Sequence, residues 1–190
     1  MIRVLGSWLK GVRAGEDKLS SNGEGIVSAP ASIVVTSAAF APGAPMPARY
    51  AGPGIGENVA PALAWTGVPD AAVELVVIME DPDVPLPRPA VHVVAYGLAP
   101  SLRGLAEGAL ASDASAAAAG AKLGKGFLGL RGYRGPGPVP GHGPHRYVFQ
   151  VFALAERLAF TKEPPGYAEV VRRMRGHVVA RGRVDGTYER

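Results

Sequence analysis

The stretch DPDVPLPRP, residues 81–89, separates two apolar runs at residues 73–79 and 91–98. Near-continuous apolar runs of this length, rich in valine, are typical of buried strands. The prolines between them cannot lie in a central strand, so they predict a rigid turn. This stretch therefore indicates two buried strands, with Asp81 at the end of the first and His92 inside the second.

A second loop, rich in glycine and proline, occupies residues 132–144 and leads into a predicted strand over residues 146–154. Because residues two apart in a strand point to one face, His145 and Tyr147 project together. If this strand and the one that carries His92 are near neighbours in one sheet, both loops meet at one end of it. We then expect Asp81, His92, His145 and Tyr147 to surround one small cavity.

Such a cavity would offer imidazole N–H groups, a phenol O–H group and backbone N–H groups. These donors suit an acceptor-rich ligand such as phosphate. The Asp81 carboxylate would repel an anion unless it accepts a proton from a histidine ring or faces the ammonium group of a zwitterion. The alternative is purely structural, with buried core histidines and an ordinary Asp-Pro-Asp turn.

The composition narrows the class of protein. Hydrophobic residues make up 47% of the 190 residues and charged residues 19%, which is typical of a globular chain. The 26 glycines and 18 prolines favour a β-rich fold with many connections. The absence of cysteine excludes disulfides and thiol catalysis. With a net charge of only +4 and no recognisable motif, we expect no nucleic-acid partner.

The N-terminal 30 residues differ from the rest. Leu5, Trp8, Leu9 and Val12 have the spacing of one helix face. Residues 15–30 look like a polar linker. We therefore predict an amphipathic helix and linker over residues 1–30 and a folded domain over residues 31–190. The helix could dock on the domain, on a second copy in a homodimer or, as a peripheral contact, on a membrane. Without a signal-peptide pattern or a transmembrane run, we expect a cytoplasmic protein.

Three later segments complete the prediction. Residues 111–121 are rich in alanine and form a short helix or a mobile loop. Residues 167–175 follow two prolines and predict a helix. Residues 177–188 have β character, which Gly182 and Gly186 interrupt.

Several segments, in this order, resemble bacterial Raf-kinase-inhibitor-like members of the phosphatidylethanolamine-binding protein family. They extend from about Ile33 to the C-terminus. They are SAAF (37–40), PARY (47–50), GENVAPALAWTGVP (56–69), DPDVP (81–85), GYRGP (132–136), GHGPHRY (141–147), GHVVA (176–180) and GTY (186–188). Three positions depart from the bacterial pattern: Val93 replaces a usual tryptophan, Gly97 an asparagine and Gly137 a cysteine.

This resemblance implies a mainly β (α+β) fold, with a large antiparallel sheet, a smaller sheet and few short helices. It also implies a ligand-binding pocket that accepts phosphate-containing small molecules or lipid head groups. The residues that it places in this pocket are Asp81, Pro85, His92, Gly137, Pro138, His145 and Tyr147. Because eukaryotic relatives inhibit kinases, a protein partner such as a kinase is a further expectation.

We therefore predict a non-enzymatic binding protein, with no catalytic residue, metal or cofactor. The alternative is a phosphoester hydrolase, in which His92, His145 and Asp81 hold a metal or act in acid–base catalysis. A covalent hydrolase is disfavoured, because neither pocket motif contains a serine or threonine nucleophile. A third option is an inhibitor or scaffold that works through its outer surface.

Overall fold

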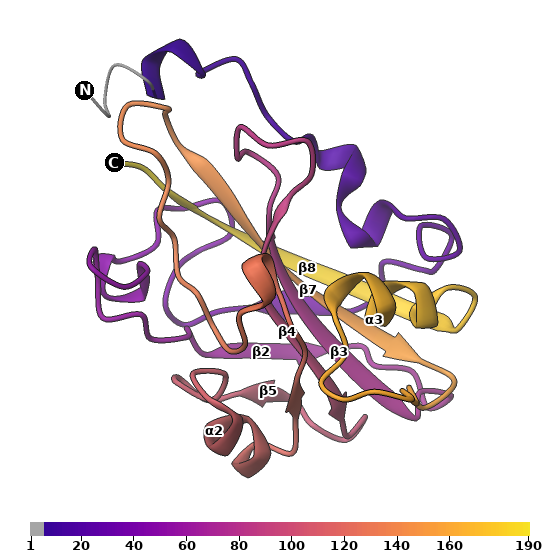
Figure 1. Ribbon diagram of the computed structural model, residues 1–190. Helices are drawn as coiled ribbons and strands as arrows, with labels where there is room; N and C mark the ends of the chain where they lie inside the picture. Colours follow the sequence, from indigo (N-terminus) through magenta and orange to yellow (C-terminus); the bar gives the residue numbers. More distant parts are fainter. Residues whose placement is uncertain (1–5) are drawn as a thin grey trace.

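The computed structural model describes residues 6–190, and two antiparallel sheets form its body (Figure 1). The smaller sheet has the order β1-β2-β5 and the larger one β6-β4-β3-β7-β8. The mainly β fold predicted from the sequence is confirmed. The strands are β1 (Val34–Thr36), β2 (Leu63–Thr66), β3 (Glu74–Asp81), β4 (Ala90–Leu98), β5 (Gly104–Leu105), β6 (Lys122–Leu123), β7 (His145–Leu154) and β8 (Val178–Tyr188).

The helices are short and peripheral. The alanine-rich segment forms α2 (Asp113–Ala118), and α3 (Tyr167–Met174) is the helix expected after the two prolines. Four 3-10 turns, η1 to η4, span Glu16–Lys18, Ser20–Asn22, Ala48–Tyr50 and Phe127–Gly129. No helix in the described part of the chain is long and apolar enough to cross a membrane.

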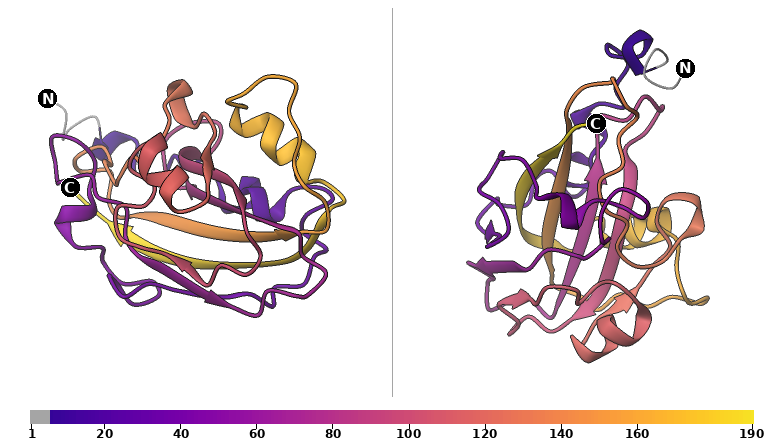
Figure 2. Two further views of the ribbon diagram at one scale, coloured as in Figure 1. Left: turned by 90° about the horizontal axis from the view of Figure 1, so that it is seen from below. Right: turned by 90° about the vertical axis from the view of Figure 1, so that its left-hand side faces the viewer.

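Both faces of the large sheet are covered. Val77 and Met79 on β3 face the smaller sheet and pack in a core that contains Trp65. Val76 and Ile78, on the other face, pack with residues of α3 and with Ile26. Figure 2 shows α3 on one side of the long strands and the smaller sheet on the other. Because β3 is covered on both faces, it has the continuous apolar sequence of a buried strand.

Residues 15–30, which we expected to form a linker, lie against the large sheet. Leu19 and Ile26 are buried, and Ser20 donates to the buried Glu80 carboxylate through its backbone N–H at 2.9 Å and through its hydroxyl at 2.5 Å. Upstream, residues 6–8 are helical and Trp8 is exposed. Leu5, which belongs to the predicted apolar face, lies outside the described residues.

Strand β8 continues through Gly182 and Gly186, so the expectation that these glycines interrupt it is wrong. They are needed because other parts of the chain cross the strand closely. A Cβ atom at Gly182 would collide with the backbone of Ile33, and one at Gly186 would lie 2.9 Å from the sulfur of Met46. Glycine here marks close approach of another segment, which is a tertiary constraint.

Replacing Gly182 with alanine should therefore destabilise the protein by about 2–3 kcal/mol, because strand β8 or residue 33 must move. Chemical denaturation would measure the change. Gly11→Ala is the matched control, since a Cβ atom there meets nothing within 4 Å. Equal stability of the two variants would contradict the close approach.

Candidate functional site

Three strand ends define the site. Strand β3 lies between β4 and β7 and is antiparallel to both. Its last residue, Asp81, pairs with Ala90 at the start of β4, and Glu80 pairs with Val148 near the start of β7. The proline loop and the glycine-proline loop therefore meet at one end of the sheet, as the spacing predicted.

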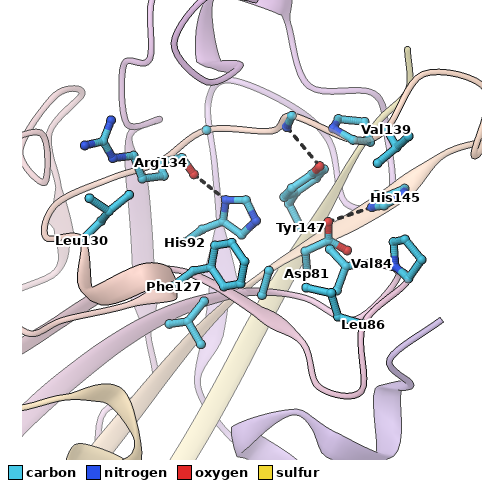
Figure 3. Close-up of a pocket in the computed structure, with 16 residues that line it drawn as sticks. Asp81, Val84, Leu86, His92, Phe127, Leu130, Arg134, Val139, His145 and Tyr147 are labelled. Carbon is cyan, nitrogen blue, oxygen red and sulfur yellow. Dashed lines mark hydrogen bonds and ion pairs between the residues drawn. The ribbon is translucent and has the colours of Figure 1, made fainter. Parts of the chain in front are cut away.

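A cavity of about 290 Å³ lies at this end (Figure 3). All seven residues predicted for a pocket line it: Asp81, Pro85, His92, Gly137, Pro138, His145 and Tyr147. Most of the remaining wall is apolar. It consists of Val84, Leu86, Ala90, Val91, Phe127, Leu130 and Val139, together with Gly135 and Arg134.

Asn58 holds the glycine-proline loop in place. Its side-chain amide donates to the Tyr133 carbonyl at 3.1 Å, and its oxygen accepts from the Gly135 N–H at 2.9 Å. Asn58 has a φ of 56°, in the left-handed region that asparagine tolerates better than most residues. These contacts tie Tyr133 and Gly135 to the segment that precedes β2.

Below the cavity, two buried histidines form a chain of hydrogen bonds that ends on Asp81. His145 Nδ1 lies 2.8 Å from Asp81 Oδ2, and His145 Nε2 lies 2.7 Å from His142 Nδ1. His142 Nε2 faces two backbone carbonyl oxygens of the N-terminal segment, that of Leu9 at 2.8 Å and that of Val12 at 3.2 Å. Both side chains are about 1% exposed.

The number of protons in these hydrogen bonds determines the net charge of the linked side chains Asp81, His145 and His142. A carbonyl oxygen only accepts, so His142 Nε2 carries a proton. The His142–His145 contact needs a second proton and the His145–Asp81 contact a third, whereas two neutral imidazoles carry only two. The third proton makes one imidazole cationic beside the Asp81 carboxylate, or else it sits on Asp81. In either case Asp81, His145 and His142 together have no net charge.

This geometry changes the role expected of His145. We expected its ring to donate to a ligand, but both ring nitrogens are already bonded within the protein. The tautomer-fixing role expected of Asp81 is in place, because its carboxylate contacts the His145 ring. The repulsion that Asp81 would exert on an anion is thereby offset.

Of the two histidines that line the cavity, His92 is the one with a free ring nitrogen. Its Nδ1 lies 2.5 Å from the Arg134 carbonyl oxygen and therefore donates to it. Figure 3 shows the other ring nitrogen pointing toward the side of the cavity that holds Tyr147 and Asp81. Burial lowers the pKa of His92 below its ordinary value, although the charge of Asp81 and the bond to Arg134 oppose the shift. At neutral pH this nitrogen is therefore an acceptor, and it becomes a donor on protonation.

The Tyr147 hydroxyl stands beside Asp81. It accepts from the Gly137 N–H at 3.3 Å, and its own proton faces the neighbouring Asp81 carboxylate. Burial, and then the charge of Asp81, raises the pKa of Tyr147, which keeps the phenol protonated. The Tyr147 and His92 rings meet edge to face, with centroids 5.2 Å apart.

A separate ionic clamp holds the proline loop. Arg146 donates to both Asp83 oxygens, at 2.9 and 3.0 Å, and its other terminal nitrogen donates to Glu16 at 2.6 Å. Burial alone would raise the pKa of Asp83, but its bonds to Arg146 outweigh burial and lower it. Arg146 thus joins the loop, strand β7 and the N-terminal segment. As expected from strand alternation, its side chain points away from that of Tyr147.

Sequence reasoning missed His142, the rim residues Phe127 and Leu130, and Arg134. His142 stands three residues before His145 in the quoted GHGPHRY segment, and that spacing was the only available signal. Two of the three departures from the bacterial pattern lie away from the cavity wall. Val93 packs in the core between the sheets, whereas Gly97 donates its N–H to Glu74. Only Gly137 lies on the cavity wall.

The metal-hydrolase alternative gains no support from the geometry. It required His92, His145 and Asp81 as ligands, but both nitrogens of His145 are engaged. Among residues 6–190, no three histidine or carboxylate side chains are grouped so that they could hold a metal ion. The cavity wall also contains no serine, threonine or cysteine.

Two packed antiparallel sheets with a small pocket at the end of the larger one define a class of binding protein. A family model described as phosphatidylethanolamine-binding protein matches residues 36–189. The chain belongs to this family, as the sequence motifs indicated. Members of this family are generally non-enzymatic binding proteins.

Relatives and solved structures agree with this assignment. A UPF0098 protein of Methanothermobacter thermautotrophicus is 38% identical over 146 residues, which cover 76% of this chain and 91% of that protein. The crystal structure of Escherichia coli YbcL, described as a new member of the mammalian family, has a TM-score of 0.78 at 26% identity. A Chlamydia trachomatis homolog has a TM-score of 0.72 at 34% identity. Each match covers 84% of this chain and 99% of the solved one.

His142→Ala should release the N-terminal segment. It removes the donor to the Leu9 and Val12 carbonyls and leaves a buried His145 nitrogen unpaired, at a cost of about 1–3 kcal/mol of stability. Hydrogen exchange should show lost protection at the Ala14 and Gly15 amides, which donate to the Val84 and Pro82 carbonyls.

The matched control is His177→Ala. The His177 side chain is partly exposed, and its contact with a Glu156 oxygen is long, at 3.6 Å. We expect this change to alter stability by no more than about 0.5 kcal/mol. Unchanged exchange at Ala14 and Gly15 in His142→Ala would show that the histidine does not anchor the segment.

Proposed function

We propose that the protein is a non-enzymatic receptor for a phosphate-type oxyanion, such as the phosphodiester of a lipid head group, with the oxyanion between His92 and Tyr147. The main support for this proposal is the free ring nitrogen of His92, which lies near the Asp81 carboxylate, whose charge is offset. A protonated His92 and the Tyr147 hydroxyl would supply two donors to one ligand oxygen or to two neighbouring ones.

The shape and lining of the cavity support a ligand with both polar and apolar parts. Its volume of about 290 Å³ is near the lower limit of small-molecule pockets. The polar groups stand at the inner end, whereas Leu86, Phe127 and Leu130 line the rest. A phosphoryl group attached to a glycerol or ethanolamine unit fits this distribution of polar and apolar surface.

Two further expectations stay proposals. Regulation of a partner protein, such as a kinase, would require an outer surface that responds to pocket occupancy. A homodimer would require an apolar face between copies. The pocket chemistry alone argues for neither, so ligand binding is the function to test first.

Binding of a phosphodiester should weaken as pH rises. An anion favours the protonated form of His92, whose pKa in the free protein is below its ordinary value of 6.5. Affinity should therefore be highest below about pH 6 and should fall roughly tenfold by about pH 8 as one charge-assisted bond is lost. Titration calorimetry with glycerophosphorylethanolamine measures this, because its phosphate does not titrate in that range.

His92→Gln keeps a polar side chain but cannot become charged, so its affinity should be low and independent of pH. The variant Val93→Ala is a control, since Val93 neighbours His92 yet packs in the core between the sheets. Affinity that is equal across this range in the parent protein would contradict a site centred on His92. Turnover of a phosphomonoester that scales with added zinc would favour the hydrolase instead.

A further inference from the structure

Exposed apolar side chains gather at the mouth of the cavity. Leu86, Leu130 and Phe127 are 39%, 41% and 45% exposed, and all three line the opening. Leu128, next to Phe127, is 80% exposed. Figure 3 shows Phe127 and Leu130 on one side of the cavity and Leu86 on the other. Single exposed leucines are ordinary, but a group around one opening marks an interaction surface. We call these four residues the apolar rim.

The backbone holds the most exposed member of the rim outward. Leu128 has a φ of 54°, a left-handed conformation that is uncommon for a non-glycine residue, inside the short turn η4. Gly129 continues the turn with a φ of 72°. Leu128 thus occupies the tip of a tight turn, where its side chain is surrounded by solvent.

Cations without acidic partners accompany the rim. Neither residues 84–90 nor residues 122–139 contain an aspartate or glutamate. Lys122 and Arg131 pair with Glu163 and Asp113, which lie outside these two segments. In the described chain, Arg88, Lys125 and Arg134 have no carboxylate within ion-pair distance. Arg134 lines the cavity itself, and Arg88 and Lys125 are each two residues from a rim residue in the sequence, so positive charge without an acidic partner accompanies the apolar side chains.

We propose that the apolar rim docks on an anionic lipid bilayer, with the cavity opening toward the head groups. Protruding apolar side chains flanked by lysine and arginine are the chemistry that an anionic membrane surface binds. A protein partner would need a larger complementary surface, whereas a fluid bilayer adapts to a single projecting turn. The inference goes beyond the proposed function, because the cavity can bind a soluble phosphodiester with no bilayer present.

Co-sedimentation with vesicles tests the docking. The protein should bind phosphatidylcholine vesicles that contain phosphatidylglycerol, bind vesicles of phosphatidylcholine alone far less, and dissociate as salt rises. Leu128→Asp should weaken binding to the anionic vesicles by about tenfold or more, since it removes an inserted side chain and adds a negative charge. The matched control is Val34→Asp, because Val34 is 61% exposed on the edge strand β1, in the other sheet. It should bind as the parent does.

The outcomes separate this proposal from the pocket function. Leu128→Asp should bind soluble glycerophosphorylethanolamine as the parent does, which shows that the cavity is intact. Failure of the parent to bind anionic vesicles, or equal losses in Leu128→Asp and Val34→Asp, overturns the docking proposal whatever the cavity binds. Light scattering that shows an oligomer of the parent dissociated by Leu128→Asp, without vesicle binding, would assign the rim to contacts between copies instead.

Discussion

The contact between His145 and the Asp81 carboxylate is the constraint on which the rest of the site depends. A buried carboxylate is stable only when it is paired and hydrogen-bonded. Asp81 achieves this with His145 on one oxygen and the Asp83 N–H on the other, at 2.8 Å each. The end of β3, the proline loop and the start of β7 must therefore converge. In the proposed binding mode, an oxyanion would approach this carboxylate because the histidine pair offsets its charge.

The network around Asp81 also explains why residues 9–16, which precede the family match, pack closely on the domain. The match begins at residue 36, yet Glu16 binds Arg146 and Arg183, and the Leu9 and Val12 carbonyls complete the bonding of His142. Part of the inner wall of the pocket is thus held from behind by the N-terminal segment. In this protein, the segment acts as a structural support for the charged network rather than as a free tether.

Much of the fold and the pocket could be predicted from the sequence, because strand periodicity and the position of Asp81, His92 and His145 at or near strand ends are local signals. The histidine chain could not, since its partners at Leu9 and Val12 lie about 130 residues away and are backbone atoms. The rim was missed because Phe127 and Leu130 lie in an irregular turn without periodicity. We expected Gly182 to interrupt the strand, because the local sequence does not show that Ile33 crowds this position in the folded protein.

The central claim is that His92, and not His145, gains a proton when an oxyanion enters the cavity. Nitrogen NMR of the histidine rings during a titration with sulfate tests this directly, since each ring nitrogen reports its own protonation. We expect the resonance of the free His92 nitrogen to shift toward that of the protonated form, while the His142 and His145 rings keep their resonances. Saturable sulfate binding that leaves His92 unchanged and protonates or displaces His145 would contradict it.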